Sequence, residues 1–326
     1  MYSWVRYALP TVPTRAANKA TNQTIARPMG DLTVVLPQLS ENRQTDLFAA
    51  SRTALYTLTP MTKPKAMVLR TAGTNCDEET VHAWELAGAD TCRVHIRELA
   101  DQPGRLREVE ILTIPGGFSY GDDISAGKIL ACQLIHHLAD ALREFVSAGK
   151  LVLGICNGFQ ALVKAGLLPG CERSADGRVD PIGPQVVTLT QNDSARFEDR
   201  WIHLRASSRP NAFLPADVIL AMPIAHGEGK LVAADDTVLH RLGTDGHIAL
   251  TYCDSQGRPG PYPINPNGSQ SDIAGLTDVT GRILGLMPHP ERHVYAHQHP
   301  EWTRQRNTHP DGRVLFETAV RTAKSL

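Results

Sequence analysis

The sequence of 326 residues lacks the features that would direct it to a membrane or to nucleic acid. It has no run of about 20 apolar residues, the length that a membrane span needs. Its 33 basic and 34 acidic residues leave a formal net charge of -1, so no global field attracts nucleic acid or an anionic membrane. The first thirty residues lack the apolar core of a secretory signal. We therefore expect a cytoplasmic protein that binds a small polar ligand, and neither nucleic acid nor membranes.

The cysteines and histidines also lack the spacing of a metal site. The 6 cysteines include no C-x-x-C pair and no closely spaced set with histidine. Three histidines near the end of the chain have no matching set of Cys, Asp or Glu, so we expect solvated loop residues at His293, His297 and His299. No metal is predicted. Reduced thiols are the default for such a chain, which leaves a cysteine free to act as a nucleophile.

Two regions differ in their pattern. Residues 1–60 carry scattered Pro, Thr and Ala without a sustained apolar period, and the first thirty contain no acid. We expect a loosely ordered extension, with an organelle-type targeting segment or an upstream start ahead of Met61 as alternatives. Residues 62–326 show no repeat and no long linker, so we expect one elaborated domain there.

Within this domain, short apolar runs alternate with amphipathic stretches, which predicts βαβ units and a doubly wound, mostly parallel sheet in an α/β fold. One helix should begin at Asp77 and end at Gly88, and a longer one carries leucines at i+4 spacing from Leu130 to Leu142. Ligands of such folds bind beyond the carboxyl ends of the strands. The expected strands are residues 66–69, 91–96, 110–114, 150–155, 185–189, 202–205, 247–252 and 282–287.

A sharp turn is expected at Cys156, between the strand that begins at Lys150 and a helix that follows at once. Gly154 and Gly158 flank the cysteine at i-2 and i+2, where side chains would collide as the chain reverses. A helix amino terminus lowers the pKa of a thiol, and the thiolate is the reactive form. This arrangement is a nucleophile elbow. The alternative, a small buried hydrophobe, is our expectation for the other five cysteines.

Attack on an amide also needs donors for the developing oxyanion and a base. The backbone N–H of Asn157 is one candidate donor, and Pro115-Gly116-Gly117 is the other, because glycine lets the backbone approach a substrate closely. An ordinary strand-to-loop turn is the alternative for that tripeptide.

The candidate base is His289 in Met287-Pro288-His289-Pro290-Glu291. Pro290 favours an extended conformation at His289, and side chains at i and i+2 then point the same way, so Glu291 could orient the imidazole. A surface histidine beside an acid is the alternative. The position of His289, directly after an apolar strand, favours a role in proton transfer.

These motifs resemble the class I glutamine amidotransferases, whose pattern is G-x-C-x-G-x-Q followed much later by His-x-Glu. Within that class the sequence is most similar to the glutaminase subunits of phosphoribosylformylglycinamidine synthase in purine biosynthesis. A glutaminase of another pathway would share only the nucleophile and His-x-Glu blocks. The blocks that carry the similarity, in family order, are residues 115–122 (PGGFSYGD), 156–160 (CNGFQ), 225–229 (AHGEG), 267–269 (NGS) and 288–292 (PHPER).

The resemblance implies a flavodoxin-like fold and a glutaminase that acts through a glutamyl thioester. Ammonia would pass to a synthetase that uses ATP and Mg to convert formylglycinamide ribonucleotide into the amidine. The implied roles are nucleophile for Cys156, proton shuttle for His289, orienter for Glu291, and oxyanion or glutamine binding for Gly116, Gly117, Asn157 and Gln160.

The synthetase must be a separate chain, because this one has no G-x-x-x-x-G-K-[ST] phosphate loop and no room for a second catalytic domain. The expected partners are therefore L-glutamine, the synthetase subunit and a small accessory subunit, with no cofactor in this chain. Two alternatives remain: a class I glutaminase that serves a different acceptor, and a binding subunit that uses the elbow fold without catalysis.

Overall fold

The structure is a computed structural model that describes residues 63–170, 180–304 and 309–326. The predicted extension, residues 1–60, lies outside the described residues. None of the helices in the described ranges combines the length and the apolar character that a membrane crossing requires.

One half of the main sheet is parallel. Five strands lie in the order β2-β1-β3-β4-β11, and every pairing between neighbours among them is parallel. Strands β3, β4 and β11 are buried along their whole length, because helices cover both faces. This order is the flavodoxin-like 2-1-3-4-5 arrangement, which confirms the predicted fold class. The bounds are β1 Lys65–Arg70, β2 Asp90–His95, β3 Ile111–Ile114, β4 Leu151–Ile155 and β11 Ile283–Leu286.

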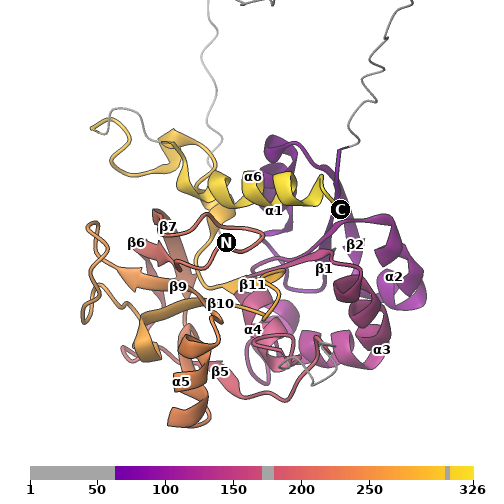
Figure 1. Ribbon diagram of the computed structural model, residues 1–326, viewed down its shortest axis with the longest axis horizontal. Coiled ribbons are helices and arrows are strands. Elements are labelled where there is room, and N and C mark those ends of the chain that lie inside the picture. Colours follow the sequence, from indigo (N-terminus) through magenta and orange to yellow (C-terminus); the bar gives the residue numbers. More distant parts are fainter. Residues whose placement is uncertain (1–62, 171–179, 305–308) are drawn as a thin grey trace, which may run out of the picture. The chain divides into compact units, whose positions relative to one another are not determined.

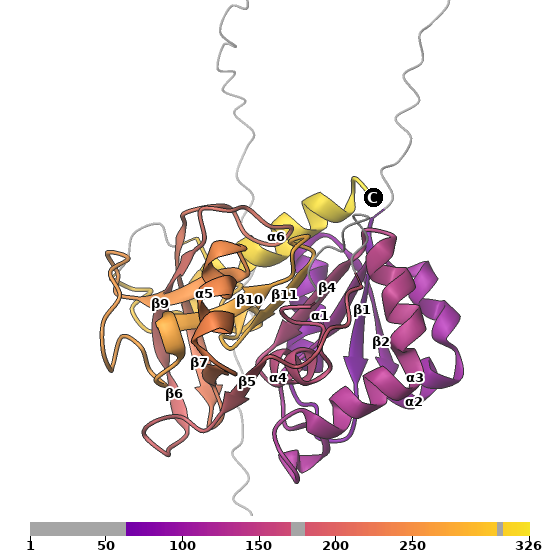
Figure 2. The ribbon, with the colours of Figure 1, turned by 60° about the horizontal axis from the view of Figure 1, so that its bottom comes forward.

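Helices pack on both faces of this half (Figures 1 and 2). Helices α1 (Asp77–Ala87) and α6 (Asp311–Ala323) lie together on one face. Helices α2 (Ile96–Asp101), α3 (Lys128–Ser147) and α4 (Asn157–Lys164) cover the other. The sheet is therefore doubly wound, as predicted.

The other half of the sheet is antiparallel and continues as β11-β10-β9-β6-β7. Strands β5 and β8 form a separate antiparallel pair. The sequence did not indicate β7, β8 or β10; in β7 buried and half-buried residues alternate around an internal proline, so no continuous apolar run marks the strand. The bounds are β5 Val187–Thr190, β6 Glu198–Ala206, β7 Ile219–His226, β8 Lys230–Ala233, α5 Asp236–Thr244, β9 Ile248–Cys253 and β10 Ile273–Thr277.

Local signals explain where α1 ends and α2 begins. Gly88 closes α1 in the left-handed conformation with a φ of 94°, as predicted. The predicted strand 91–96 is shifted by one residue toward the carboxyl terminus, because β2 ends at His95, whose side chain accepts a hydrogen bond from the backbone N–H of Arg97. Ile96 therefore starts a helix. Short 3-10 helices occupy Pro103–Glu108, Ser119–Asp122, Gln270–Asp272, Pro290–Arg292 and Ala296–Gln298.

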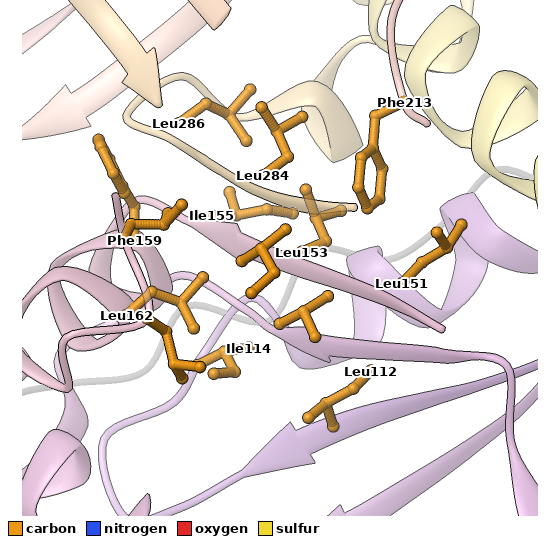
Figure 3. Packing of buried hydrophobic residues seen from close by; sticks show 14 of the residues in the cluster. Leu112, Ile114, Leu151, Leu153, Ile155, Phe159, Leu162, Phe213, Leu284 and Leu286 are labelled. Atoms are coloured by element: carbon orange, nitrogen blue, oxygen red, sulfur yellow. The ribbon is translucent and has the colours of Figure 1, made fainter. Parts of the chain in front are cut away.

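The hydrophobic core lies on both sides of β4 (Figure 3). Leu153 is fully buried between its neighbours on β3 and β11. On the face that α1 and α6 cover, Trp84 meets Phe316 edge to face at 4.8 Å, and its Nε1 donates to Thr113 Oγ1 at 2.9 Å. The indole nitrogen is thus satisfied inside the core, where an unpaired donor would be costly.

We predict that Leu153→Ala lowers the free energy of unfolding by about 2–5 kcal/mol, because a cavity is left at a fully buried position. Denaturant unfolding followed by circular dichroism measures this change. The matched control is Ile124→Ala, whose side chain is 74% exposed and whose loss should cost less than about 0.5 kcal/mol. Equal effects of the two substitutions would contradict the placement of β4 at the centre of the core.

Candidate active site

A cleft of about 460 Å³ opens where β3, β4 and β11 end. These three strands are neighbours, so the segments that follow their carboxyl ends meet at one edge of the sheet. Four of the seven predicted site residues line the cleft directly: Gly117, Cys156, Gln160 and His289. The other three, Gly116, Asn157 and Glu291, lie behind this lining and contact it.

Cys156 occupies a strained turn between β4 and α4. Its φ of 50° and ψ of -105° lie outside the regions that non-glycine residues favour. The backbone N–H of Cys156 donates to the Leu286 carbonyl on β11 at 2.8 Å, which fixes the turn to the neighbouring strand. The thiol donates to the Ala225 carbonyl at 3.7 Å. Strain of this kind is a feature of functional sites, and here it directs the thiol into the cleft.

Gly158 makes the turn possible. A Cβ atom at this position would overlap the carbonyl oxygen of Ile114 at the end of β3. Gly154 is similarly constrained, since its Cβ would lie 2.9 Å from the carbonyl oxygen of Gly158. The two flanking glycines therefore have the steric role that the elbow motif predicted.

His289 and Glu291 form a buried pair. The His289 Nδ1 lies 2.7 Å from Glu291 Oε1, so the hydrogen bond that the sequence suggested is present. It forms across the start of a 3-10 turn rather than along an extended strand, because Pro290–Arg292 is helical. The backbone N–H of His289 donates to Pro223 on β7 at 2.9 Å, which anchors the histidine to the antiparallel half of the sheet.

The charges around His289 favour its protonated form. Burial alone lowers the pKa of an imidazole, but here Glu291 and the Cys156 sulfur outweigh burial and raise the pKa of His289 well above its ordinary value. The Nε2 atom is buried and has no hydrogen-bond partner in the described structure. The imidazolium is thus the favoured form of His289 in this cleft.

The amide-bearing side chains form a chain of hydrogen bonds along the cleft. Asn157 Nδ2 donates to Asp122 Oδ1 and to Gln160 Oε1, both at 3.0 Å. Gln160 Nε2 in turn donates to the backbone carbonyl of Glu228 at 2.6 Å.

Gly117 is a position where only glycine fits. It has a φ of 135°, where a side chain would be strained, and a Cβ atom there would lie 2.8 Å from the backbone nitrogen of Asn75.

Residues 225–228 of the segment 225–229 form one wall of the cleft. Asn192 holds it, because its Oδ1 accepts from the Gly229 N–H and lies 3.1 Å from the Nδ1 of His226. Asn267 supports the same segment by donating to the Gly229 carbonyl at 2.9 Å. Burial lowers the pKa of His226 to about 4, so this imidazole is neutral. The sequence block 225–229 thus forms this wall of the cleft, and the block 267–269 supports it.

Cys76 is a residue of the cleft that the sequence argument missed. It was expected to be structural, but it lines the cleft at the start of α1 and lies next to His289. Its sulfur accepts from Arg292 Nη2 at 3.2 Å, and Arg292 Nε pairs with Glu79 at 2.9 Å. Burial, above other influences, raises the pKa of the Cys76 thiol. No elbow glycines mark this cysteine, so the sequence held no signal for its position.

Among the described residues, Cys76, Glu79, His289 and Glu291 bring four possible metal-ligand atoms within 4.8 Å of one another. The Arg292 guanidinium already bonds to the first two, and the last two bond to each other. These donors therefore have protein partners, and a cation would have to displace Arg292.

Two of the three histidines expected in solvated loops are buried. His293 and His299 are 2% and 8% exposed, and both pack against Trp201 with ring centroids 4.9 and 4.6 Å away. The expectation was wrong for these two because β6 brings an aromatic side chain under a segment that is polar in sequence. His297 is exposed, as predicted.

Comparison with known proteins identifies the family. Residues 63–321 match the CobB/CobQ-like glutamine amidotransferase domain. The chain belongs to this amidotransferase family. Among its relatives, a protein of Dehalococcoides mccartyi named phosphoribosylformylglycinamidine synthase subunit PurQ is 45% identical over 269 residues, covering 82% of this chain and 100% of that protein. A Methanococcus maripaludis protein of the same name is 43% identical and covers 73% of this chain and 86% of that protein.

The fold of this amidotransferase also matches a solved structure. A chain in the structure of PurLQS from Thermotoga maritima aligns with a TM-score of 0.58 and 30% identity, covering 79% of this chain and 98% of that one. The resemblance to class I glutamine amidotransferases, and within them to the subunits of one synthase, is thus confirmed.

We predict that Gly158→Ala lowers the free energy of unfolding by roughly 3 kcal/mol or more, because the new methyl group overlaps the Ile114 backbone and the elbow must shift. Gly104→Ala is the matched control, since its Cβ would meet nothing within 4 Å. Thermal and denaturant unfolding compare the two proteins. A Gly158→Ala variant as stable as the control would contradict the close approach of α4 to β3.

We also predict that Glu291→Gln lowers the pKa of His289, because the largest of the influences that oppose burial is removed. NMR titration of protein labelled at histidine measures this pKa. Glu79→Gln serves as the control, since Glu79 pairs with Arg292 and leaves the His289–Glu291 hydrogen bond in place. An unchanged pKa in Glu291→Gln would show that another group charges the imidazole.

Proposed function

We propose that this chain is the glutaminase subunit of a phosphoribosylformylglycinamidine synthase, and that residues 62–326 form its amidotransferase domain. The observation that carries the proposal is the meeting of the strained Cys156 with the His289–Glu291 pair in one cleft. The relatives that bear the name of this synthase subunit supply its pathway.

In the proposed reaction, Cys156 attacks the side-chain amide carbon of glutamine as a thiolate. His289 holds the proton that the thiol has lost and gives it to the departing ammonia, while Glu291 stabilises the imidazolium. The backbone N–H groups of Gly117 and Asn157 are the candidate donors to the oxyanion. His289 then takes a proton from water, which hydrolyses the thioester to glutamate and frees Cys156.

The acceptor of the ammonia is proposed to lie in a separate synthetase chain. The similar proteins support this step: the relatives are named as synthase subunits, and the similar solved chain belongs to the PurLQS structure of Thermotoga maritima. The proposed partners are a synthetase subunit that uses ATP and Mg and a small accessory subunit. In this proposal, this chain hydrolyses glutamine without a cofactor. The five described cysteines are free thiols, which suits the proposed cytoplasmic location.

The test compares two nitrogen sources in the complex with its synthetase. We predict that Cys156→Ala abolishes amidine formation with glutamine, because the thioester cannot form, and leaves formation with ammonium salts within about twofold of wild type. Cys132→Ala is the matched control, since Cys132 is an exposed cysteine on α3.

Each outcome bears on a separate part of the proposal. Glutamine-dependent activity retained in Cys156→Ala would contradict the role of the thiol. Failure of ammonium to support either protein would contradict the assignment to this synthase and would favour a different acceptor.

A further inference from the structure

The turn that carries His289 and Glu291 is held on two sides through its backbone. On the side of β7, the backbone N–H of His289 donates to the Pro223 carbonyl at 2.9 Å. On the side of α6, a Cβ atom at Gly312 would overlap the Pro290 carbonyl oxygen, so the helix packs directly on the turn. On a third side, toward α1, the contact is made by a side chain.

Arg292 makes this third contact. Its Nε donates to Glu79 Oε1 at 2.9 Å, and its Nη2 donates to the Cys76 sulfur at 3.2 Å. Cys76 directly precedes α1 and Glu79 lies in the first turn of that helix, 216 and 213 residues away from Arg292 in the sequence. The planar guanidinium presents its donors in a fixed fork, so two bonds to one helix set the orientation of the turn as well as its distance. We call these two bonds the Arg292 bridge.

Cys76 joins the Arg292 bridge to the imidazole. The sulfur and the His289 ring both pack on Gly116, where a Cβ atom would lie 3.1 Å from Cys76 Sγ and 2.9 Å from His289 Cε1. The thiol donates to Asn75 Oδ1 at 3.2 Å, while the sulfur accepts from Arg292. Burial, above other influences, raises the pKa of this thiol, so it stays neutral and packs beside the imidazole without acting as a second nucleophile.

The Arg292–Glu79 pair matters more for geometry than for stability. The two side chains are 35% and 37% exposed, and an ion pair this open to water adds little to the free energy of unfolding. Arg292 directly follows Glu291, whose carboxylate lies 2.7 Å from the Nδ1 of His289. A guanidinium fixed to α1 therefore restrains the residue that orients the imidazole. Catalysis is sensitive to such restraint, because a displacement of about 1 Å can cost a hundredfold in rate.

We propose that Arg292 is a positioning residue of the glutaminase reaction, which holds the His289–Glu291 turn against α1 through Cys76 and Glu79. The inference rests on the proposed glutaminase function. Arg292 forms and breaks no bond of the substrate in this proposal; it keeps the imidazole in place while the proton moves to ammonia and later from water. Loss of the Arg292 bridge should therefore slow the reaction of bound glutamine and leave its binding nearly unchanged.

The experiment measures kcat and KM for L-glutamine in the complex with its synthetase. Arg292→Ala should lower kcat by about ten- to a hundredfold and keep KM within about threefold of wild type, because the imidazole is displaced and the glutamine contacts remain. Amidine formation with ammonium salts should stay within about twofold of wild type, which shows that the complex has assembled. Arg292→Lys should give an intermediate kcat, since a lysine keeps the charge and lacks the fork that bonds to both partners.

Arg313→Ala is the matched control. Arg313 pairs with Glu317 on α6, and these side chains are 35% and 37% exposed, the same fractions as in the Arg292–Glu79 pair. This variant should keep the wild-type kcat. Glu79→Ala should lower kcat, because it removes one of the two acceptors of the Arg292 bridge. Glu79→Ala combined with Arg292→Ala should cost no more than Arg292→Ala alone, since the two residues act through one interaction.

A kcat within twofold of wild type in Arg292→Ala would overturn the inference. A raised KM with an unchanged kcat would also overturn it, because Arg292 lines the cleft and would then be a contact of the ligand. If Arg292→Ala fails to fold or to assemble, Arg292→Lys and Glu79→Ala decide, and a wild-type kcat in both overturns the inference. Failure of the proposed function looks different: wild type would then not use glutamine, or Cys156→Ala would still use it.

Discussion

The close approach of Gly158 to the end of β3 is the constraint on which the rest of the site depends. Because no side chain separates α4 from the Ile114 carbonyl, the chain can reverse within one residue after β4. That reversal forces Cys156 into its strained conformation and places its thiol over the edge where β3 and β11 also end. A wider turn would leave the parallel sheet intact and move the thiol away from His289.

The parallel half of the fold and the elbow could be predicted because both have local causes. A buried parallel strand is a continuous apolar run, and the flanking glycines report a steric need that no other residue meets. The antiparallel half was harder to predict, since β7 has alternating burial and an internal proline. Its position is set by pairing with β6, a contact that no local pattern records.

The residues to which the sequence analysis assigned no role in the site enter the cleft, or support it, from distant parts of the chain. Cys76 comes from the start of α1, lies next to His289 and accepts a hydrogen bond from Arg292, which also bonds to Glu79. Residues 225–229 come from the end of β7, and Asn192 and Asn267 hold them from two separate loops. Blocks of sequence with no evident chemistry thus form one wall of the proposed glutamine site. Two thiols, Cys76 and Cys156, line the same cleft, and only the second has the elbow.

The presence of two thiols beside one histidine makes the site of acylation the most direct test of the account. The complex is mixed with L-glutamine, quenched in acid within its turnover time, digested and examined by mass spectrometry for a peptide that carries one glutamyl group. We predict the adduct on Cys156 in wild type and in Cys76→Ala, and no adduct in Cys156→Ser. An adduct on Cys76, or one that persists in Cys156→Ser, would contradict it.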